Sequence, residues 1–253
     1  MTTPPQTFFV TWRSPTTRAI RPVARIRYYA DQSYYEFRYV VNVAAALADG
    51  FTPLLEFPEL ARTYTSPRPF PLLANRFMPP KRPEYAGFLA ALGLPPDAHP
   101  MAILARTGGE RQTDQIELFP VPTPAEDGCY LTHCLVRGVR HMPEPETEKR
   151  VALLQPGDSL TVVAEPENPR DPLAARLETA DGVALGYLPA YLAADVWRLR
   201  EVCGQVSVHV ERVNPLPAEA HHRLLVCVKA CWPTGFVPYS GPEFQPVPPH
   251  QPT

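Results

Sequence analysis

Alternation of apolar and polar positions near the start of the chain predicts β-structure over residues 8–41. Arg21–Tyr29 and Tyr34–Val41 are rich in β-branched and aromatic residues, as strands usually are. Residues 30–33 between them, Ala-Asp-Gln-Ser, suit a tight turn. We therefore expect the two strands to form a hairpin.

The first of these strands carries a row of positive charges. Arg21, Arg25 and Arg27 are separated by even steps, and side chains alternate across a strand, so the three are expected on one face. Two interpretations remain open, because such a face either binds phosphate or is simply solvated.

Later in the first half, the apolar spacing becomes helical, for example at Tyr85, Phe88 and Leu92. The elements expected here are helices at Pro83–Leu92 and Met101–Arg106 and a strand at Gln115–Val121. Together with the hairpin they predict an α+β domain over residues 8–121.

Residues 122–128 are interpreted as a linker, because they mix prolines and acidic residues without periodicity. Short β-rich runs follow, interrupted by one helix at about Ala190–Val202. The runs are Tyr130–Val139, Ser159–Ala164, Ala174–Glu178, Val183–Leu188, Gln205–Val213 and Arg223–Ala230. This pattern predicts a small, mostly-β, partly open barrel over residues 129–232.

Residues 233–253 are rich in proline and carry one charged residue, Glu243. A segment of this composition buries too little surface to fold alone. We expect a flexible tail, which is a candidate ligand for a partner protein.

The overall charge argues against a protein that coats nucleic acid without specificity. The formal net charge is −2 and the pI is about 6.4, so no global positive field attracts a phosphate backbone, and any nucleic-acid contact must be local.

The N-terminus lacks a secretory signal pattern, and the longest near-apolar stretch, Val40–Ala48, is too short to span a bilayer. We therefore expect a cytoplasmic protein with no membrane partner.

The five cysteines favour structural thiols. None lies in a C-x-x-C pair, their number is odd, and their spacings are poor for zinc. Cysteine often behaves as a small buried hydrophobe, which is the interpretation that we favour. A metal site and a disulfide are the alternatives.

The sequence contains none of the common catalytic motifs. A phosphate-binding loop, a dinucleotide-binding glycine motif and the H-E-x-x-H zinc motif are all missing from it. Gly108–Gly109 follows a predicted helix and so is expected to end it. We expect no enzymatic activity, no cofactor and no metal. A metal-dependent enzyme using His and Cys side chains remains the alternative.

One constellation in the second half is suited to binding. Residues 168–172, Asn-Pro-Arg-Asp-Pro, form a double-proline turn. Its Asn and Asp side chains bond either the backbone or, if they point outward, a hydroxyl or a base edge. Arg140, at the end of the first barrel strand, is placed to reach the same mouth and to grip a phosphate.

This order of motifs resembles the HIRAN domain over about residues 130–213. The first strand of that family ends in G-x-R-aromatic, here residues 138–141. An N-P-x-D-x-x-A turn follows at residues 168–174, and then G-x-L-P at residues 186–189. The resemblance implies an OB-like barrel that captures the 3′-hydroxyl end of single-stranded DNA.

Carried onto this chain, the resemblance implies a role for each of five residues. Arg140 contacts phosphate, and His141 occupies the position at which an aromatic side chain stacks on a base. Asn168 and Asp171 surround the terminal nucleotide and its hydroxyl, and Tyr187 lines the same pocket. The alternative for Asn168 and Asp171 is a turn that only holds the barrel shut.

Two positions depart from the family pattern. Met142 stands where a second aromatic residue follows the arginine, and Ala190 stands where a lysine can occur. Stacking of a base on an aromatic side chain contributes about 1–3 kcal/mol. We therefore expect weaker or differently specified binding.

The first half is similar to the N-terminal lobe of HipA-type toxin kinases, over about residues 20–120. The similarity depends on the segments 35–39, 70–77, 83–94 and 101–109. Because the HIRAN-like region occupies the rest of the chain, no kinase lobe follows. The similarity implies a module for docking or regulation without phosphoryl transfer.

The sequence therefore predicts a non-enzymatic nucleic-acid-binding protein that binds single-stranded DNA or a 3′ DNA end. The alternative is a protein-interaction adaptor or regulatory subunit in a bacterial toxin–antitoxin or phage-defence system. Its partner would bind the first domain or the Pro-rich tail.

Overall fold

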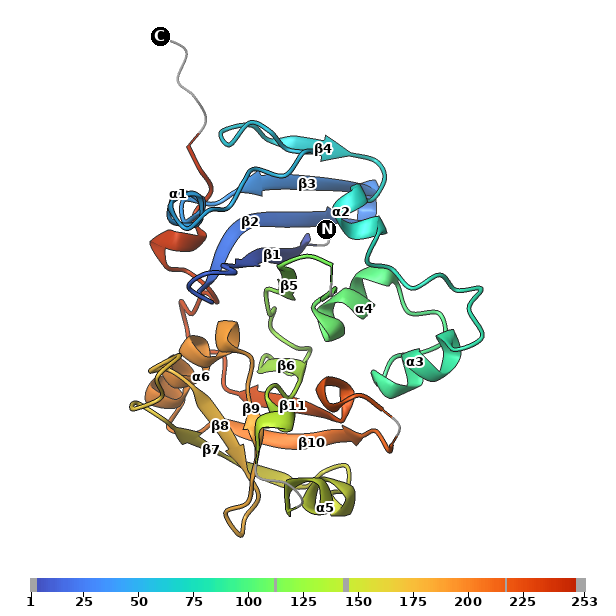
Figure 1. The fold of residues 1–253 in the computed structure, drawn as a ribbon, viewed down its shortest axis with the longest axis vertical. Helices are drawn as coiled ribbons and strands as arrows, with labels where there is room; N and C mark the ends of the chain where they lie inside the picture. Colours follow the sequence, from blue (N-terminus) through green and yellow to red (C-terminus); the bar gives the residue numbers. More distant parts are fainter. Residues whose placement is uncertain (1–3, 112, 143–145, 217, 249–253) are drawn as a thin grey trace. The chain divides into compact units, whose positions relative to one another are not determined.

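The computed structural model describes residues 4–111, 113–142, 146–216 and 218–248. The chain folds into two compact units (Figure 1). The first unit draws on residues 1–82, 99–121 and 237–253, and the second on residues 83–98 and 122–236. Helix α3 (Tyr85–Ala91), predicted as part of the first domain, therefore lies in the second unit.

The first unit contains an antiparallel sheet of five strands in the order β4-β3-β2-β1-β5. The strands are β1 (Gln6–Arg13), β2 (Ile20–Tyr29), β3 (Tyr34–Tyr39), β4 (Tyr64–Ser66) and β5 (Ile116–Pro120). The connection from β2 to β3 is a short 3-10 helix, η1 (Ala30–Gln32), followed by Ser33 in a left-handed conformation with φ 49°. The predicted hairpin is therefore present, with its turn at the expected residues.

One face of this sheet carries the core of the first unit. Phe8 and Val10 of β1, Ile26 of β2 and Phe37 of β3 are fully buried there. Three helices contribute to the same core, α1 (Val43–Ala48), α2 (Pro71–Ala74) and α4 (Pro100–Thr107). Helix α4 ends at Gly108, which adopts a left-handed φ of 72°, as expected of a glycine that ends a helix.

A β-bulge divides the row of arginines predicted on β2. The pairing of β2 with β1 shifts register, and Val23 and Ala24 are both fully buried, so the alternation of faces breaks between them. Arg21 consequently lies on the core side of the sheet, whereas Arg25 and Arg27 lie on the opposite side. The prediction that the three share one face is wrong, because it assumed an uninterrupted strand.

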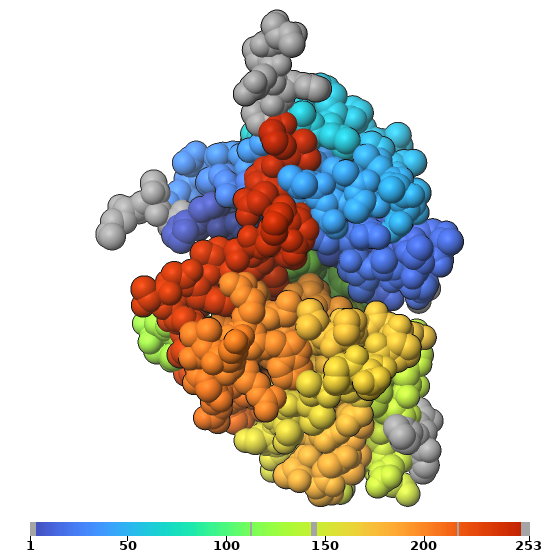
Figure 2. Space-filling view, turned by 90° about the vertical axis from the view of Figure 1, so that its left-hand side faces the viewer, coloured from blue at the N-terminus to red at the C-terminus, as the bar shows by residue number. Residues whose placement is uncertain are grey.

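The C-terminal segment is attached to the first unit. The backbone of residues 245–247 forms hydrogen bonds of 2.8 and 2.9 Å with the end of β3 and the residues after it. The rings of Tyr239 and Phe244 pack against Phe9, and Tyr239 is only 5% exposed. Figure 2 shows this segment, in red, lying along the first unit. The prediction of a flexible tail is therefore wrong for residues 237–248, because isolated aromatic side chains and backbone bonds hold the segment.

The second unit contains a curled sheet of six antiparallel strands in the order β6-β11-β10-β7-β8-β9 (Figure 1). The strands are β6 (Tyr130–Leu135), β7 (Ser159–Ala164), β8 (Ala175–Glu178), β9 (Ala184–Tyr187), β10 (Ser207–Val213) and β11 (Leu224–Ala230). An antiparallel bridge between Arg137 and Tyr187 connects the two edges of the sheet. This curled half-barrel confirms the predicted OB-like architecture.

Helix α6 (Ala190–Cys203) packs against the sheet of the second unit through the buried residues Leu192, Val196 and Leu199. It begins after Pro189 and ends before Gly204, within two residues of the predicted bounds. Helix α5 (Glu146–Leu153) was not predicted, because its short sequence is mostly polar and shows no apolar period. No helix among the described residues is long and apolar enough to cross a membrane.

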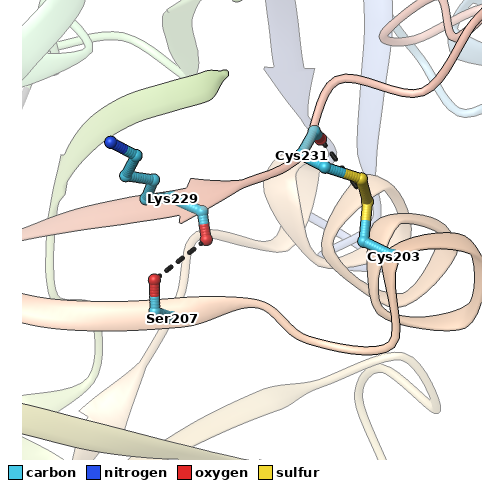
Figure 3. The surroundings of a disulfide bond; sticks show 4 residues. All are labelled: Cys203, Ser207, Lys229 and Cys231. Atoms are coloured by element: carbon cyan, nitrogen blue, oxygen red, sulfur yellow. Dashed lines mark hydrogen bonds between the residues drawn. A yellow bond between two sulfur atoms is a disulfide. The ribbon is translucent and has the colours of Figure 1, made fainter. Parts of the chain in front are cut away.

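A disulfide connects Cys203 and Cys231, the first of which ends α6 while the second follows β11 (Figure 3). Structural thiols were favoured for all five cysteines, and for this pair the prediction is wrong. The reason is that the packing of α6 on β11 brings together two residues that lie 28 positions apart. Cys129, Cys134 and Cys227 lie outside disulfides.

Candidate nucleic-acid interface

The bridge between Arg137 and Tyr187 fixes one side of the candidate site. Each backbone N–H donates a 2.8 Å hydrogen bond to the carbonyl of the other residue. Gly138 follows with a left-handed φ of 71°, and a Cβ at this position would lie 3.2 Å from the ring of Tyr187. Glycine is therefore favoured here both by the backbone conformation and by the approach of the ring.

The 3-10 helix η2 (Val139–His141) begins directly after Gly138 and presents two of the predicted residues. Arg140 and His141 are both exposed, and the Nε of Arg140 lies 3.3 Å from Nε2 of His141. Buried Val139 attaches η2 to the core of the second unit. The 3-10 helix η2, which carries both residues, thus lies beside the strand that carries Tyr187.

Glu165 lies at the centre of a polar network that includes Tyr187 and Asn168. Its Oε2 accepts a 3.0 Å hydrogen bond from the hydroxyl of Tyr187 and a 2.8 Å bond from Nδ2 of Asn168. Its other oxygen pairs with Arg176, which also pairs with Glu178. One carboxylate therefore links β8, β9 and the loop that follows β7.

The network favours the charged form of Glu165. The hydrogen bond from Asn168, followed by those from Tyr187 and Arg176, holds the pKa of Glu165 below its ordinary value despite partial burial. Burial, and then the bond to Glu165, raises the pKa of Tyr187. At neutral pH the pair is consequently a carboxylate that accepts and a neutral hydroxyl that donates.

The turn at residues 168–172 is organised by its own side chains. Oδ1 of Asn168 accepts hydrogen bonds from the backbone N–H groups of Arg170 and Asp171, at 3.0 and 3.3 Å. Oδ1 of Asp171 accepts a 2.9 Å bond from the N–H of Leu173. Both side chains therefore have the turn-stabilising role that the sequence left as the alternative. The second carboxylate oxygen of Asp171 has no hydrogen-bond partner within the described ranges.

A tryptophan attaches this turn to helix α6. Nε1 of Trp197 donates a 2.8 Å hydrogen bond to the carbonyl of Leu173. The guanidinium of Arg200 lies over the ring of Trp197, 5.6 Å from its centroid. The position of Asp171 is thus determined by the barrel and by the helix together.

The structure brings three of the five predicted residues into one hydrogen-bonded unit. Asn168 and Tyr187 meet on Glu165, and Asp171 belongs to the same turn as Asn168. Arg140 and His141 lie just after Gly138, and the backbone bridge between Arg137 and Tyr187 connects their segment to this unit. Among the described residues, no hydrogen bond or ion pair connects Arg140 to Asn168 or Asp171.

Sequence reasoning missed Glu165 and Arg176. Glu165 stands three residues before Asn168, which is a spacing at which a turn brings two side chains together. That signal was present in the sequence. Arg176 gave no such signal, because only the pairing of β7 with β8 places it beside Glu165.

The family model of the HIRAN domain matches residues 130–225. The predicted resemblance is confirmed. The matched range begins with β6 and reaches the start of β11, so it contains the whole candidate interface. HIRAN domains bind DNA, which supports a general nucleic-acid-binding role for this domain. The similarity of the first half to HipA-type kinases lies outside this match and stays a prediction.

Two solved structures are similar to the chain. One is the HIRAN domain of human HLTF, with 17% identity, a TM-score of 0.30 and coverage of 41% of this chain and 74% of that one. The other is a protein from Lactobacillus plantarum, with 18% identity, a TM-score of 0.32 and coverage of 41% and 97%. No curated protein sequence matches the chain. The assignment of the HIRAN domain rests on the family match.

Proposed function

We propose that this HIRAN domain binds the 3′ end of single-stranded DNA at the edge formed by η2, Tyr187 and the turn at residues 168–172. The observation that carries the proposal is the bridge between Arg137 and Tyr187. It joins the segment that carries exposed Arg140 and His141 to a strand whose tyrosine is hydrogen-bonded, through Glu165, to that turn.

Each group has chemistry that suits a DNA end. The guanidinium of Arg140 is exposed and able to grip a phosphate with two N–H groups. The rings of His141 and Tyr187 offer stacking surfaces, which contribute about 1–3 kcal/mol per base. The open carboxylate oxygen of Asp171 is an acceptor for the terminal hydroxyl.

The acidic groups supply selectivity for a hydroxyl end. A terminal 3′-phosphate would bring negative charge toward Asp171 and Glu165, and like charges at close range repel. A 3′-hydroxyl instead donates a hydrogen bond. We therefore propose that the site discriminates between the two ends.

The contact is proposed to be local and non-catalytic. The chain has a formal net charge of −2, so few phosphates are neutralised and the dependence of affinity on salt is shallow. For one or two phosphate contacts, the slope of log K against log salt is about −0.7 to −1.4. The chain acts by binding, without a metal or a cofactor.

Fluorescence anisotropy with labelled oligonucleotides tests this proposal. We expect wild-type protein to bind a 3′-hydroxyl oligonucleotide at least tenfold more tightly than the 3′-phosphate form. Asp171→Ala should remove most of that difference. Asp97→Ala removes the same charge from an exposed site on the second unit and should leave the difference unchanged. Equal, negligible binding of both oligonucleotides by wild-type protein would end the proposal.

One argument for the alternative function, a protein-interaction adaptor, no longer applies. It relied on a free Pro-rich tail as a ligand, whereas residues 237–248 are attached to the first unit by the contacts of Tyr239 and Phe244. Docking through the first unit remains an alternative, and co-purification of a stoichiometric partner without DNA would favour it.

A further inference from the structure

The face of the first sheet that lies opposite its core carries an unusual set of side chains. Cross-strand partners share a face, and three successive pairs of β2 and β3 point to this side, since their neighbours Ala24, Ile26, Phe37 and Tyr39 are buried in the core. The pairs are Arg25 with Arg38, Arg27 with Glu36, and Tyr29 with Tyr34. We call these six residues the arginine face.

The charges of the arginine face are poorly compensated. Arg25 lies directly opposite Arg38, an arrangement of like charges that destabilises a sheet. The one carboxylate of the face, on Glu36, is 3.8 Å from Arg27, which is too far for a hydrogen bond. Three positive charges are thus gathered around one negative charge, in a chain whose net charge is negative.

The guanidinium groups are also partly removed from water. The Nε atoms of Arg25 and Arg27 are buried, and neither has a hydrogen-bond partner among the described residues. Burial, and then the charge of Arg27, lower the pKa of Arg25 to about 10, so it stays charged at neutral pH. Arginines on a solvated face would keep all their N–H groups in water. This observation argues against the interpretation that the row is simply solvated.

The surroundings leave the arginine face accessible. The side chain of Arg27 keeps 35% of its exposure, and Arg25 and Arg38 are half-buried. The C-terminal segment covers Phe9, the β1 neighbour of Arg25, and one nitrogen of Arg38 donates a 3.1 Å bond to the carbonyl of Val247. The segment therefore orients Arg38 and forms one wall beside the face.

An aromatic pair forms the opposite boundary. The rings of Tyr29 and Tyr34 are stacked with centroids 4.4 Å apart and an interplanar angle of 7°. On this face of the sheet, Tyr29 and Tyr34 form the cross-strand pair that follows Arg27 and Glu36. A ligand held by the arginines would therefore contact tyrosine edges and hydroxyls at one end.

We propose that the arginine face binds a phosphate group. The planar guanidinium forks of Arg25, Arg27 and Arg38 suit a phosphate oxyanion, which accepts hydrogen bonds from guanidinium N–H groups and offsets the repulsion between Arg25 and Arg38. The phosphate comes either from the backbone of a single-stranded nucleic acid or from a free mononucleotide. This site lies on the first unit and requires none of the HIRAN residues.

Inorganic phosphate is the first probe, added to the full chain at constant ionic strength. Isothermal titration calorimetry should show binding to wild-type protein, and the melting temperature should rise with phosphate because the arginine charges are offset. Arg25→Gln and Arg38→Gln should each weaken binding at least tenfold and abolish the rise. Arg62→Gln, which removes an exposed positive charge from the same unit, should behave as wild type.

A short oligonucleotide and adenosine monophosphate then identify the source of the phosphate. These titrations use the Tyr187→Ala background, in which the loss of a stacking ring weakens binding at the proposed HIRAN site. If Arg25→Gln lowers residual oligonucleotide binding and its salt slope by about 0.7 per lost contact, the phosphate belongs to a nucleic-acid backbone. If it lowers only the binding of the mononucleotide, the site takes a free nucleotide.

The proposal is overturned if wild-type protein binds neither inorganic phosphate nor adenosine monophosphate in these titrations. It is equally overturned if Arg25→Gln and Arg62→Gln bind them alike. Neither result depends on discrimination between 3′ ends, so this proposal and that of the HIRAN site fail separately.

Discussion

The hydroxyl of Tyr187 donates a 3.0 Å hydrogen bond to Glu165, which also accepts a bond from Asn168. A residue of the G-Y-L-P motif is thereby joined to a residue of the N-P-x-D turn through a third residue that belongs to neither motif. The two motifs that identify the HIRAN domain are consequently parts of one hydrogen-bonded unit.

Removal of this hydroxyl separates the two roles of Tyr187. In Tyr187→Phe the ring remains and the bond to Glu165 is lost, so we expect about 1 kcal/mol less stability in urea denaturation. Affinity for a 3′-hydroxyl oligonucleotide should fall only a few-fold, whereas Tyr187→Ala should lose about 1–3 kcal/mol of binding. Tyr85→Phe, on α3 of the same unit, serves as the control. Equal effects of the Phe and Ala substitutions on binding would contradict a stacking role.

The approach of the sheet edges depends on Gly186. Its φ is 138°, and a Cβ there would lie 2.5 Å from the carbonyl oxygen of Arg137, inside the bridge to Tyr187. Gly186→Ala should therefore disturb the bridge and reduce oligonucleotide affinity at least tenfold. Gly182→Ala is a matched control, because φ is 84° there and no atom lies within 4 Å of the added Cβ. Equal affinities of the two variants would show that the bridge does not position the site.

The pKa of Glu165 predicts a loss of stability in acid. Its folded-state pKa is lowered, first by Asn168, so the unfolded chain binds a proton at higher pH than the folded one. Stability from this group is complete above the unfolded pKa of about 4.3 and declines as the pH falls through the lower folded value. Glu165→Gln should flatten this part of a melting-temperature profile between about pH 5 and 2. Glu167→Gln, at an exposed side chain outside this network, serves as the control, and an unchanged profile for Glu165→Gln would refute the assignment.

The disulfide between Cys203 and Cys231 should contribute measurably to stability. Closing a loop of 28 residues lowers the entropy of the unfolded chain, which raises its free energy by about 3–4 kcal/mol at room temperature. We expect Cys203→Ser, or reduction of the wild type, to lower the free energy of unfolding by up to this amount. Cys129→Ser should change it little, since that residue lies outside the disulfide. A melting temperature that does not respond to reductant would contradict the prediction.

The C-terminal segment should stabilise the first unit. Tyr239 is 5% exposed and packs on Phe9 and Phe119, so Tyr239→Ala should cost about 2–4 kcal/mol in chemical denaturation. Val237→Ala, at a neighbouring side chain that is 56% exposed, should cost less than about 0.5 kcal/mol. If both substitutions were neutral, the segment would be a free tail.

Much of the secondary structure could be predicted from local sequence. Strand β7 coincides with the predicted run Ser159–Ala164, and α6 extends one residue beyond its predicted end. Both follow from patterns that are complete within a few residues. The bulge at Val23–Ala24 could not be predicted, because it depends on the register with β1. The disulfide and the attachment of the C-terminal segment also depend on contacts between distant residues.

The candidate site also combines features that local sequence predicts with features that depend on contacts between distant residues. Motifs placed Asn168, Asp171 and Tyr187 in one region, and their order along the chain was sufficient for that. The hydrogen bonds of Asn168 were not predictable, because the same amide serves a turn or a ligand equally well. Glu165 and Arg176 became visible only when adjacent strands placed them together.

The most direct test of the central claim is an NMR titration of the isotopically labelled full chain with a 3′-hydroxyl oligonucleotide. We predict amide shift changes at residues 138–141, in the turn at 168–173 and at Tyr187, saturating together. Weaker changes on the arginine face would titrate separately. The account would be contradicted if, at oligonucleotide concentrations that saturate binding, shift changes occurred elsewhere but not at residues 138–141, residues 168–173 or Tyr187.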